Sequence, residues 1–249
     1  MSGHSKWSTI KHKKGAKDAR RSKIFTKLIK EITVAAKMGG GDMNANSRLR
    51  LAVNNARENN MPSDTIQRAI KKGTGGNDGV DYEEVLYEGY GPHNTAVVVK
   101  ALTDNRNRTA GNVRAIFTKN GGNMGATNSV LYQFDHKGLI EVNKDDLTED
   151  ALTEFLLEAG GDDLADAGDH FLVTTAMEAM EKVKHYLEAK GATIRSAILT
   201  YLPQNKVVID DMEQAEKVMH FLDKLEDDDD VQQVYSNFEI SDKIAEQLA

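Results

Sequence analysis

The first third of the chain has the hydrophobic spacing of amphipathic helices. From Ser22 onward, apolar side chains recur every three or four positions and would share one helix face, namely Phe25, Leu28, Ile29, Ile32 and Ala36. The glycines at 39–41 are expected to end this helix. The same spacing predicts a second helix over residues 45–58 and a third that runs from the N-cap Ser63 to Gly73. We therefore predict a small helical bundle over residues 22–76.

Beyond residue 80 the pattern changes to short strands that alternate with helices. Strands are predicted over residues 83–90, 95–102, 129–134, 139–142, 170–174, 193–202, 206–209 and 231–238. Helices are predicted between residues 104 and 122 and over residues 148–159, 177–190 and 211–225. This order is typical of sandwiches with helices on one face of a sheet. The expected fold class is α+β multidomain, with an N-terminal three-helix bundle followed by two α/β sandwich domains of the ferredoxin-like type.

Charge divides the chain into a basic N-terminal part and an acidic remainder. The formal net charge of the whole chain is −7, but residues 1–76 contain 17 Lys and Arg against 5 Asp and Glu, a net charge of +12. Residues 77–249 contain the other 15 basic and 34 acidic residues, a net charge of −19. Such asymmetry indicates a polyanionic partner for the basic part. The acidic remainder would be repelled by the same partner and so would orient the molecule.

The basic part supplies the candidate nucleic-acid-binding residues. Residues 1–21 form a basic arm that buries too little apolar surface to order itself in isolation. Its Trp7, with His4 and His12, can stack on unpaired bases, an interaction worth about 1–3 kcal/mol per base. The alternatives are that Trp7 docks the arm onto the helices and that the helix lysines form an ordinary solvated face. The predicted contact residues are Lys6, Trp7, Lys11, His12, Lys13, Lys14, Lys17, Arg20, Arg21, Lys23, Lys27, Lys30, Arg48, Arg50, Arg57, Arg68, Lys71 and Lys72.

A second candidate site follows the second predicted strand. Arg106 and Arg108 project from a strand-to-helix junction, and Arg114 lies two turns further on. A helix N-terminus beside two arginines suits an anion. In the alternative arrangement, Asp104 or Asn105 caps the helix while the arginines pair with acidic residues nearby. The sequence leaves both arrangements open.

Signatures of catalysis or metal binding are not found in the sequence. The chain has no cysteine, which excludes thiolate chemistry, and it has no nucleotide-binding or hydrolase motif. Asp162, Asp163, Asp166 and Asp169 miss the spacing of a calcium loop and are interpreted as an acidic surface loop, and Asp227–Asp230 as a solvated turn. We expect no enzymatic activity, cofactor, metal or small-molecule substrate. Without a secretory signal or a run of about 18 apolar residues, no membrane association is expected and the expected location is cytoplasmic.

Several long motifs resemble those of the YebC family, which includes the mitochondrial translational activator of cytochrome c oxidase. They are Gly3–Trp7, Ile10–Lys13, Asp18–Ile29, Asn46–Arg50, Asn60–Pro62, Arg68–Lys71, Tyr87–Pro92, Leu102–Thr109 and Val113–Phe117. The resemblance covers essentially the whole chain and is densest before residue 135. Two turns depart from the family pattern, since residues 39–43 lack its prolines and residues 92–94 lack its glycines.

The resemblance implies three domains, of which the second is interrupted by the third. With Gly73–Gly79 as a linker, the expected divisions are an arm over 1–21, a bundle over 22–76, a discontinuous α/β domain over 80–134 plus 205–249, and an inserted α/β domain over 135–204.

Two functions remain open at this point. The family is described as DNA-binding transcriptional regulators, which implies sequence-specific binding to duplex DNA. Members are also described as ribosome-associated translation factors that ease stalling on proline-rich stretches, which implies binding of rRNA by the basic arm. No helix shows a convincing set of base-reading side chains, whereas a polycation with one tryptophan suits folded RNA. The physical argument therefore favours the second function and the family description the first, and the sequence leaves the oligomeric state open.

Overall fold

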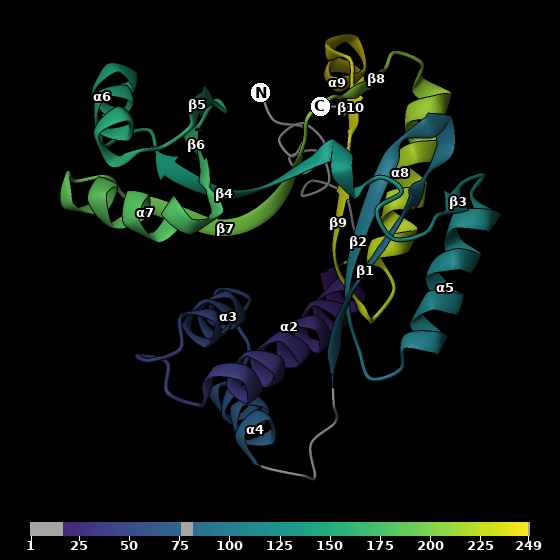
Figure 1. Ribbon diagram of the computed structural model, residues 1–249, viewed down its shortest axis with the longest axis horizontal. Coiled ribbons are helices and arrows are strands. Elements are labelled where there is room, and N and C mark those ends of the chain that lie inside the picture. Colours follow the sequence, from purple (N-terminus) through teal and green to yellow (C-terminus); the bar gives the residue numbers. More distant parts are fainter. Residues whose placement is uncertain (1–16, 76–81, 249) are drawn as a thin grey trace. The chain divides into compact units, whose positions relative to one another are not determined.

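The computed structural model describes the backbone of residues 17–75 and 82–248, with the side chains of 22–75 and 82–247 (Figure 1). A helical region precedes strand-rich regions whose sheets are covered by helices, so the predicted α+β fold class is confirmed. The described residues divide into two compact units. One contains everything up to residue 131 together with 211–234, and the other contains 132–210 and everything from residue 235. The domain bounds expected from the sequence stay a prediction.

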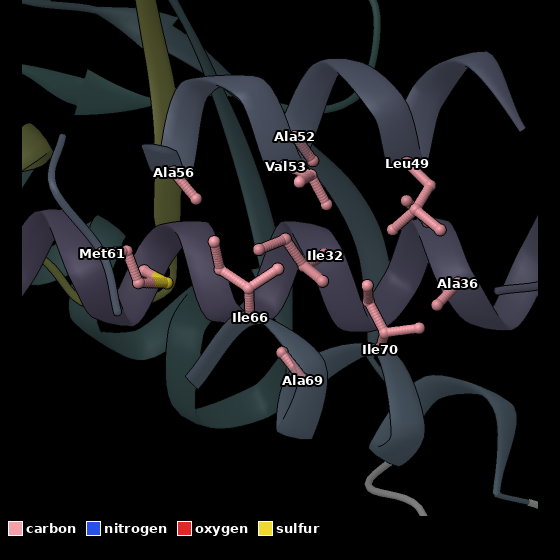
Figure 2. Packing of buried hydrophobic residues seen from close by; sticks show 11 residues of the cluster. Ile32, Ala36, Leu49, Ala52, Val53, Ala56, Met61, Ile66, Ala69 and Ile70 are labelled. Carbon is pink, nitrogen blue, oxygen red and sulfur yellow. The ribbon is translucent and has the colours of Figure 1, made fainter. Parts of the chain in front are cut away.

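The predicted helical bundle is present as α2 (Lys17–Gly39), α3 (Ser47–Glu58) and α4 (Ser63–Thr74) within the described residues. Their apolar faces meet in one core (Figure 2), made of Ile32, Ala35, Ala36, Leu49, Ala52, Val53, Ala56, Met61, Ile66, Ala69 and Ile70. Full burial of one such Leu or Ile side chain contributes about 1.5–3 kcal/mol, so burial of this core stabilises the bundle. The small alanines allow the helices to approach closely.

Asn46 fixes the joint between α2 and α3. Gly40 adopts a left-handed φ of 81° and ends α2 where the sequence predicted an end. The side-chain oxygen of Asn46 then accepts a hydrogen bond from the Leu49 N–H at 3.0 Å. Its amide nitrogen donates to the carbonyls of Ala35 at 2.8 Å and Gly40 at 2.9 Å. Because Asn46 is the N-cap, α3 begins two residues later than predicted.

The helix α4 lies very close to α2. Pro62 occupies its N-cap, so Ser63 is the first helical residue and not the predicted cap. At the other end, a Cβ on Gly73 would lie 2.3 Å from the Thr33 carbonyl oxygen and 2.7 Å from the Ala36 Cβ. Only glycine fits this crossing without moving a helix. Of the expected linker, residues 76–79 lie outside the described residues.

The first sheet has the strand order β3-β1-β2-β9. Its elements are β1 (Glu83–Tyr90), the 3₁₀ turn η2 (Pro92–Asn94), β2 (Ala96–Thr103), α5 (Arg106–Lys119), β3 (Asn123–Met124), α8 (Met212–Glu226) and β9 (Val231–Ser236). β1 and β2 form an antiparallel hairpin, and β2, which contains the valine run 97–99, is buried along nearly its whole length. The rings of Phe117 on α5 and Phe221 on α8 meet edge to face with centroids 5.0 Å apart.

The second sheet has the order β5-β6-β4-β7 and the element order of a ferredoxin-like fold. The chain runs through β4 (Phe134–Asn143), α6 (Glu149–Ala159), β5 (Asp163–Asp166), β6 (His170–Ala176), the 3₁₀ turn η4 (Met177–Ala179), α7 (Met180–Ala189) and β7 (Ile194–Pro203). Neighbouring strands are antiparallel. Both helices share a core with the sheet that includes Ile140, Leu152, Phe171, Val183 and Leu187.

The strand predicted over residues 129–134 is wrong. Most of this segment forms a turn and the 3₁₀ helix η3 (Leu131–Gln133), and only Phe134 belongs to a strand. The cause is the buried carboxylate of Glu88, which accepts backbone hydrogen bonds from Asn128 at 2.8 Å, Val130 at 3.0 Å and Leu131 at 2.7 Å. Backbone N–H groups that donate to this carboxylate are not available to donate to a neighbouring strand.

The C-terminal end of the chain also differs from the prediction. The single strand expected over 231–238 is split into β9 and β10 (Phe238–Ile240), and β10 pairs in parallel with β8 (Val207–Ile209). A final helix, α9 (Asp242–Leu248), has no counterpart in the prediction. Short parallel pairing depends on contacts between distant segments, which hydrophobic periodicity does not reveal.

Candidate nucleic-acid interface

The predicted arm contacts fall outside the part of the chain that the structure describes in detail. Lys6, Trp7, Lys11, His12, Lys13 and Lys14 lie within residues 1–16, which are not described. Lys17, Arg20 and Arg21 are on the first turns of α2, but their side chains also lie outside the described ones. The structure therefore bears on the helix residues of the predicted interface, and the arm stays a prediction.

The outer faces of α3 and α4 present exposed cations. Arg50 and Arg57 on α3 and Lys71 and Lys72 on α4 are all exposed, and the Arg50 guanidinium donates to the Met43 carbonyl at 3.1 Å. These side chains project away from the bundle core because they occupy the helix positions opposite the apolar face. They provide positive charge that a phosphate backbone can reach.

Two other predicted cations of the bundle are paired. The guanidinium of Arg48 lies 2.7 Å from Glu31 and 3.1 Å from Glu84, and the hydrogen bond to Glu31 raises its pKa against the opposing effect of burial. Arg68 lies 2.8 Å from Asp64 one turn earlier on α4, and both side chains are exposed. An exposed pair of this kind contributes about 0–1 kcal/mol, so Arg68 can exchange Asp64 for a phosphate at little cost.

The lysines of α2 do not form the open basic face that the sequence predicted. Lys23 pairs with Asp227 at 2.9 Å, and Lys27 donates to the Glu226 carbonyl at 2.7 Å. Lys30 is 9% exposed and lies 2.6 Å from the carboxylate of Asp230. Its ammonium is thus buried in an internal ion pair, and a role of Lys30 as a phosphate contact stays a prediction.

Asp230 is the centre of a buried polar cluster and not part of a solvated turn. It is 5% exposed and accepts hydrogen bonds from Lys30, from Arg108 at 2.8 Å and from the Thr109 hydroxyl at 2.7 Å. Burial opposes its ionisation, but these donors outweigh burial and lower the pKa of Asp230 to about 2. The predicted solvated turn is thus wrong at its last residue. The cluster joins α2, α5 and the residue that precedes β9.

At the second candidate site, the structure contains the helix cap and the ion pairs of the alternative arrangement. The Asn105 side chain caps α5 by accepting from the Arg108 N–H at 3.0 Å. Arg108 pairs with Asp104 at 2.7 Å and with Asp230, and the hydrogen bonds to these carboxylates raise its pKa. Arg106 lies 3.7 Å from Glu83. Arg114 is exposed on α5, and the role of Arg106, Arg108 and Arg114 as anion contacts stays a prediction.

The aspartate cluster at 162–169 pairs with basic side chains. Asp162 lies 2.9 Å from Lys137, Asp166 lies 2.6 Å from Lys144, and Asp169 lies 2.9 Å from Arg195. Hydrogen bonds from His170 and Arg195 lower the pKa of Asp169 to about 2. The segment was predicted as a loop, but residues 163–166 form the edge strand β5. Charged residues on an edge strand discourage pairing with other chains.

The loop of residues 226–230 is the feature that sequence reasoning missed. The sequence pattern predicts a solvated turn at Asp227–Asp230 and a face for phosphate at the lysines 23, 27 and 30. A signal was present, because three lysines on one helix stripe and a run of four aspartates are complementary in charge. The sequence pattern does not reveal that these two segments, about 200 positions apart, come into contact in the fold.

None of the helices among the described residues has the length and apolar character needed to cross a bilayer. The fold and the polarised charge define an α+β protein with a basic helical N-terminal region, built from a bundle and strand-rich parts. Comparison with known proteins assigns it further. Residues 5–76 match the model of the "TACO1/YebC protein N-terminal domain", and residues 82–238 match that of the "TACO1/YebC second and third domain". The chain belongs to the TACO1/YebC family, which confirms the resemblance noted in the sequence.

Relatives and a solved structure support the assignment. The chain is 55% identical to a "probable transcriptional regulatory protein" of Desulforapulum autotrophicum over 98% of both proteins. It is 56% identical to a protein of the same description from Geobacter sulfurreducens over 100% of both. The crystal structure of a conserved hypothetical protein from Aquifex aeolicus matches with a TM-score of 0.82 at 48% identity, covering 94% of this chain and 97% of that one. The close relatives are thus named as regulatory proteins.

Proposed function

We propose that the protein is a non-catalytic, cytoplasmic regulator of gene expression that binds nucleic acid through its basic N-terminal region, acting as a DNA-binding transcriptional regulator. The observation that carries the proposal is the net charge of +12 on residues 1–76 against −19 on the rest of the chain. A cationic region of this kind binds a phosphate backbone with release of counterions. The names of the relatives support the same class of function.

The exposed cations of the bundle support this proposal. Arg50, Arg57, Lys71 and Lys72 remain exposed after the bundle has folded, although other cations of the same region are paired. They give positive charge on the outside of a bundle that has its own apolar core. The acidic remainder would be turned away from the same backbone by repulsion.

The test is charge reversal in the arm. Replacing Lys11, Lys13 and Lys14 with Glu is expected to weaken binding to duplex DNA or structured RNA by about 100-fold or more at low salt. Fluorescence anisotropy measures the affinity, and circular dichroism checks that the fold is retained. The matched control reverses three exposed lysines outside the region, Lys119, Lys182 and Lys243. Equal effects of the two triple variants would contradict a role for the arm.

A second candidate function is association with the ribosome through rRNA. The observation that favours it is the single tryptophan, Trp7, which lies among lysines and beside His4 and His12 in the arm. Aromatic side chains stack on unpaired bases, which folded RNA offers and intact duplex DNA does not.

Trp7→Ala separates the two candidates. A ribosomal role predicts a loss of about 1–3 kcal/mol in affinity for ribosomes, measured by co-sedimentation, with binding to duplex DNA unchanged. A role on DNA predicts sequence-specific, salt-resistant binding to promoter fragments and no co-sedimentation.

A further inference from the structure

Three lysines of α2 are held by one loop. Lys23, Lys27 and Lys30 are spaced by four and three residues, so they form one stripe along the helix. All three reach into residues 226–230, which are the last residue of α8 and the turn that connects it to β9. A stripe that would otherwise suit successive phosphates is therefore occupied within the chain itself.

The loop offers the lysines oxygen acceptors, as a phosphate backbone does. The ammonium groups of Lys27 and Lys30 donate to the backbone carbonyls of Glu226 and Asp229, each at 2.7 Å. The Glu226 carbonyl belongs to the last residue of α8 and so lies at the negative end of the helix dipole. Lys23 and Lys30 add carboxylates, from Asp227 and Asp230. Negatively polarised oxygens thus lie along the helix at the spacing of its cations.

The contacts differ greatly in how firmly they are held. The Lys30–Asp230 pair is buried, and Asp230 has further donors in Arg108 and Thr109, so this end is fixed. The Lys23–Asp227 pair is open to water, with side chains 41% and 55% exposed. Exposed pairs of this type are weak and screened by salt, so an added phosphate can replace the carboxylate.

We propose that the loop of residues 226–230 is a built-in anionic competitor that covers the basic stripe of α2 and is displaced at its Asp227 end when nucleic acid binds. This inference rests on the proposed function, since it concerns which part of the basic region the nucleic acid can reach. The buried ion pair between Lys30 and Asp230 stays intact, whereas the Lys23–Asp227 pair separates. Lys23 then becomes available to phosphate. The loop thereby lowers non-specific affinity for polyanions.

A pair of variants in the loop tests the competitor. Asp227→Asn removes the carboxylate that holds Lys23. Asp229→Asn changes the net charge equally in the same loop but leaves the backbone carbonyl that Lys30 uses. The affinity of the full chain for a fluorescein-labelled stem-loop RNA and for a short duplex DNA is measured by anisotropy at low salt. We expect Asp227→Asn to bind about two- to tenfold more tightly than Asp229→Asn. Equal affinities of the two variants would overturn the inference.

The outcomes separate this inference from the proposed function. If the wild type binds the probes and the two variants bind them with equal affinity, the proposal of a competitor loop is refuted and nucleic-acid binding stands. If only Asp227→Asn binds the probes, the loop blocks binding in the wild type and the inference is supported. If neither the wild type nor Asp227→Asn binds either probe, the proposed function and the inference both fail.

Discussion

The ammonium of Lys30 and the carboxylate of Asp230 lie 2.6 Å apart, and both residues are buried. They come from α2 and from the loop before β9, which are 200 positions apart in the chain. Buried charges of this type are stable only as a pair, because a single partner would be left uncompensated in a poorly solvated site. The pair therefore ties the basic bundle to the sheet that contains β9.

Removing one or the other partner of this ion pair should lower the free energy of unfolding by unequal amounts. Asp230→Ala leaves Lys30 buried without its carboxylate and is expected to lower the free energy of unfolding by about 3–5 kcal/mol. Lys30→Met should cost clearly less, because Asp230 keeps its hydrogen bonds from Arg108 and Thr109. Urea denaturation of both variants measures the difference. Equal losses would mean that the remaining donors do not stabilise the carboxylate.

The same carboxylate should make stability depend on acid pH. The pKa of Asp230 is lowered from 3.8 to about 2 in the folded protein. A lowered pKa stabilises the folded state above about pH 4, and this contribution, about 2 kcal/mol, is lost as the pH falls through about 2. The difference in unfolding free energy between the wild type and Asp230→Asn should therefore shrink between these pH values. A difference that stays constant over the window would contradict the assignment.

Two glycines should respond to alanine in opposite directions. A Cβ on Gly73 would lie 2.3 Å from the Thr33 carbonyl, so Gly73→Ala should separate α2 from α4 and destabilise by about 1–3 kcal/mol. Gly111, on α5, has open space around it, and Gly111→Ala should stabilise by about 0.5–1 kcal/mol. Thermal unfolding compares them. A stabilising Gly73→Ala would show that the helices do not cross this closely.

The buried carboxylate of Glu88 should control the turn that follows β3. Glu88→Gln replaces one acceptor oxygen with an amide donor, which faces the N–H groups of Asn128, Val130 and Leu131. The expected loss is about 1–3 kcal/mol, with faster hydrogen exchange at these three amides. Glu84→Gln, at an exposed position of the same strand, is the control and should cost no more than about 1 kcal/mol. Unaltered exchange in Glu88→Gln would rule out this role.

Local pattern was enough for much of the fold. The three helices of the bundle follow from the spacing of residues such as Ile32, Leu49 and Ile66, which do form one core. The double burial of β2 follows from its valines. In each case the information lies within about one turn or strand of sequence, where periodicity is informative.

The errors in the fold have a common cause in long-range contacts. The strand expected at 129–134 is a turn because its backbone N–H groups donate to the carboxylate of Glu88, about 40 positions away. The paired lysines of α2 depend on a loop about 200 positions away. Charge composition indicated that residues 1–76 are basic, but it could not show that Lys30 would be buried. Exposure of a charge is a property of the tertiary fold.

The most direct test of the account is the salt dependence of nucleic-acid binding by the full chain. Affinities for duplex DNA and for structured RNA are measured over a series of salt concentrations and plotted as log K against log salt. Recognition of phosphate by the basic region predicts binding at low salt and a linear decline with a slope of about −4 or steeper, since each phosphate contributes about −0.9 on B-DNA. If the protein binds neither DNA, RNA nor ribosomes at low ionic strength, the account is contradicted.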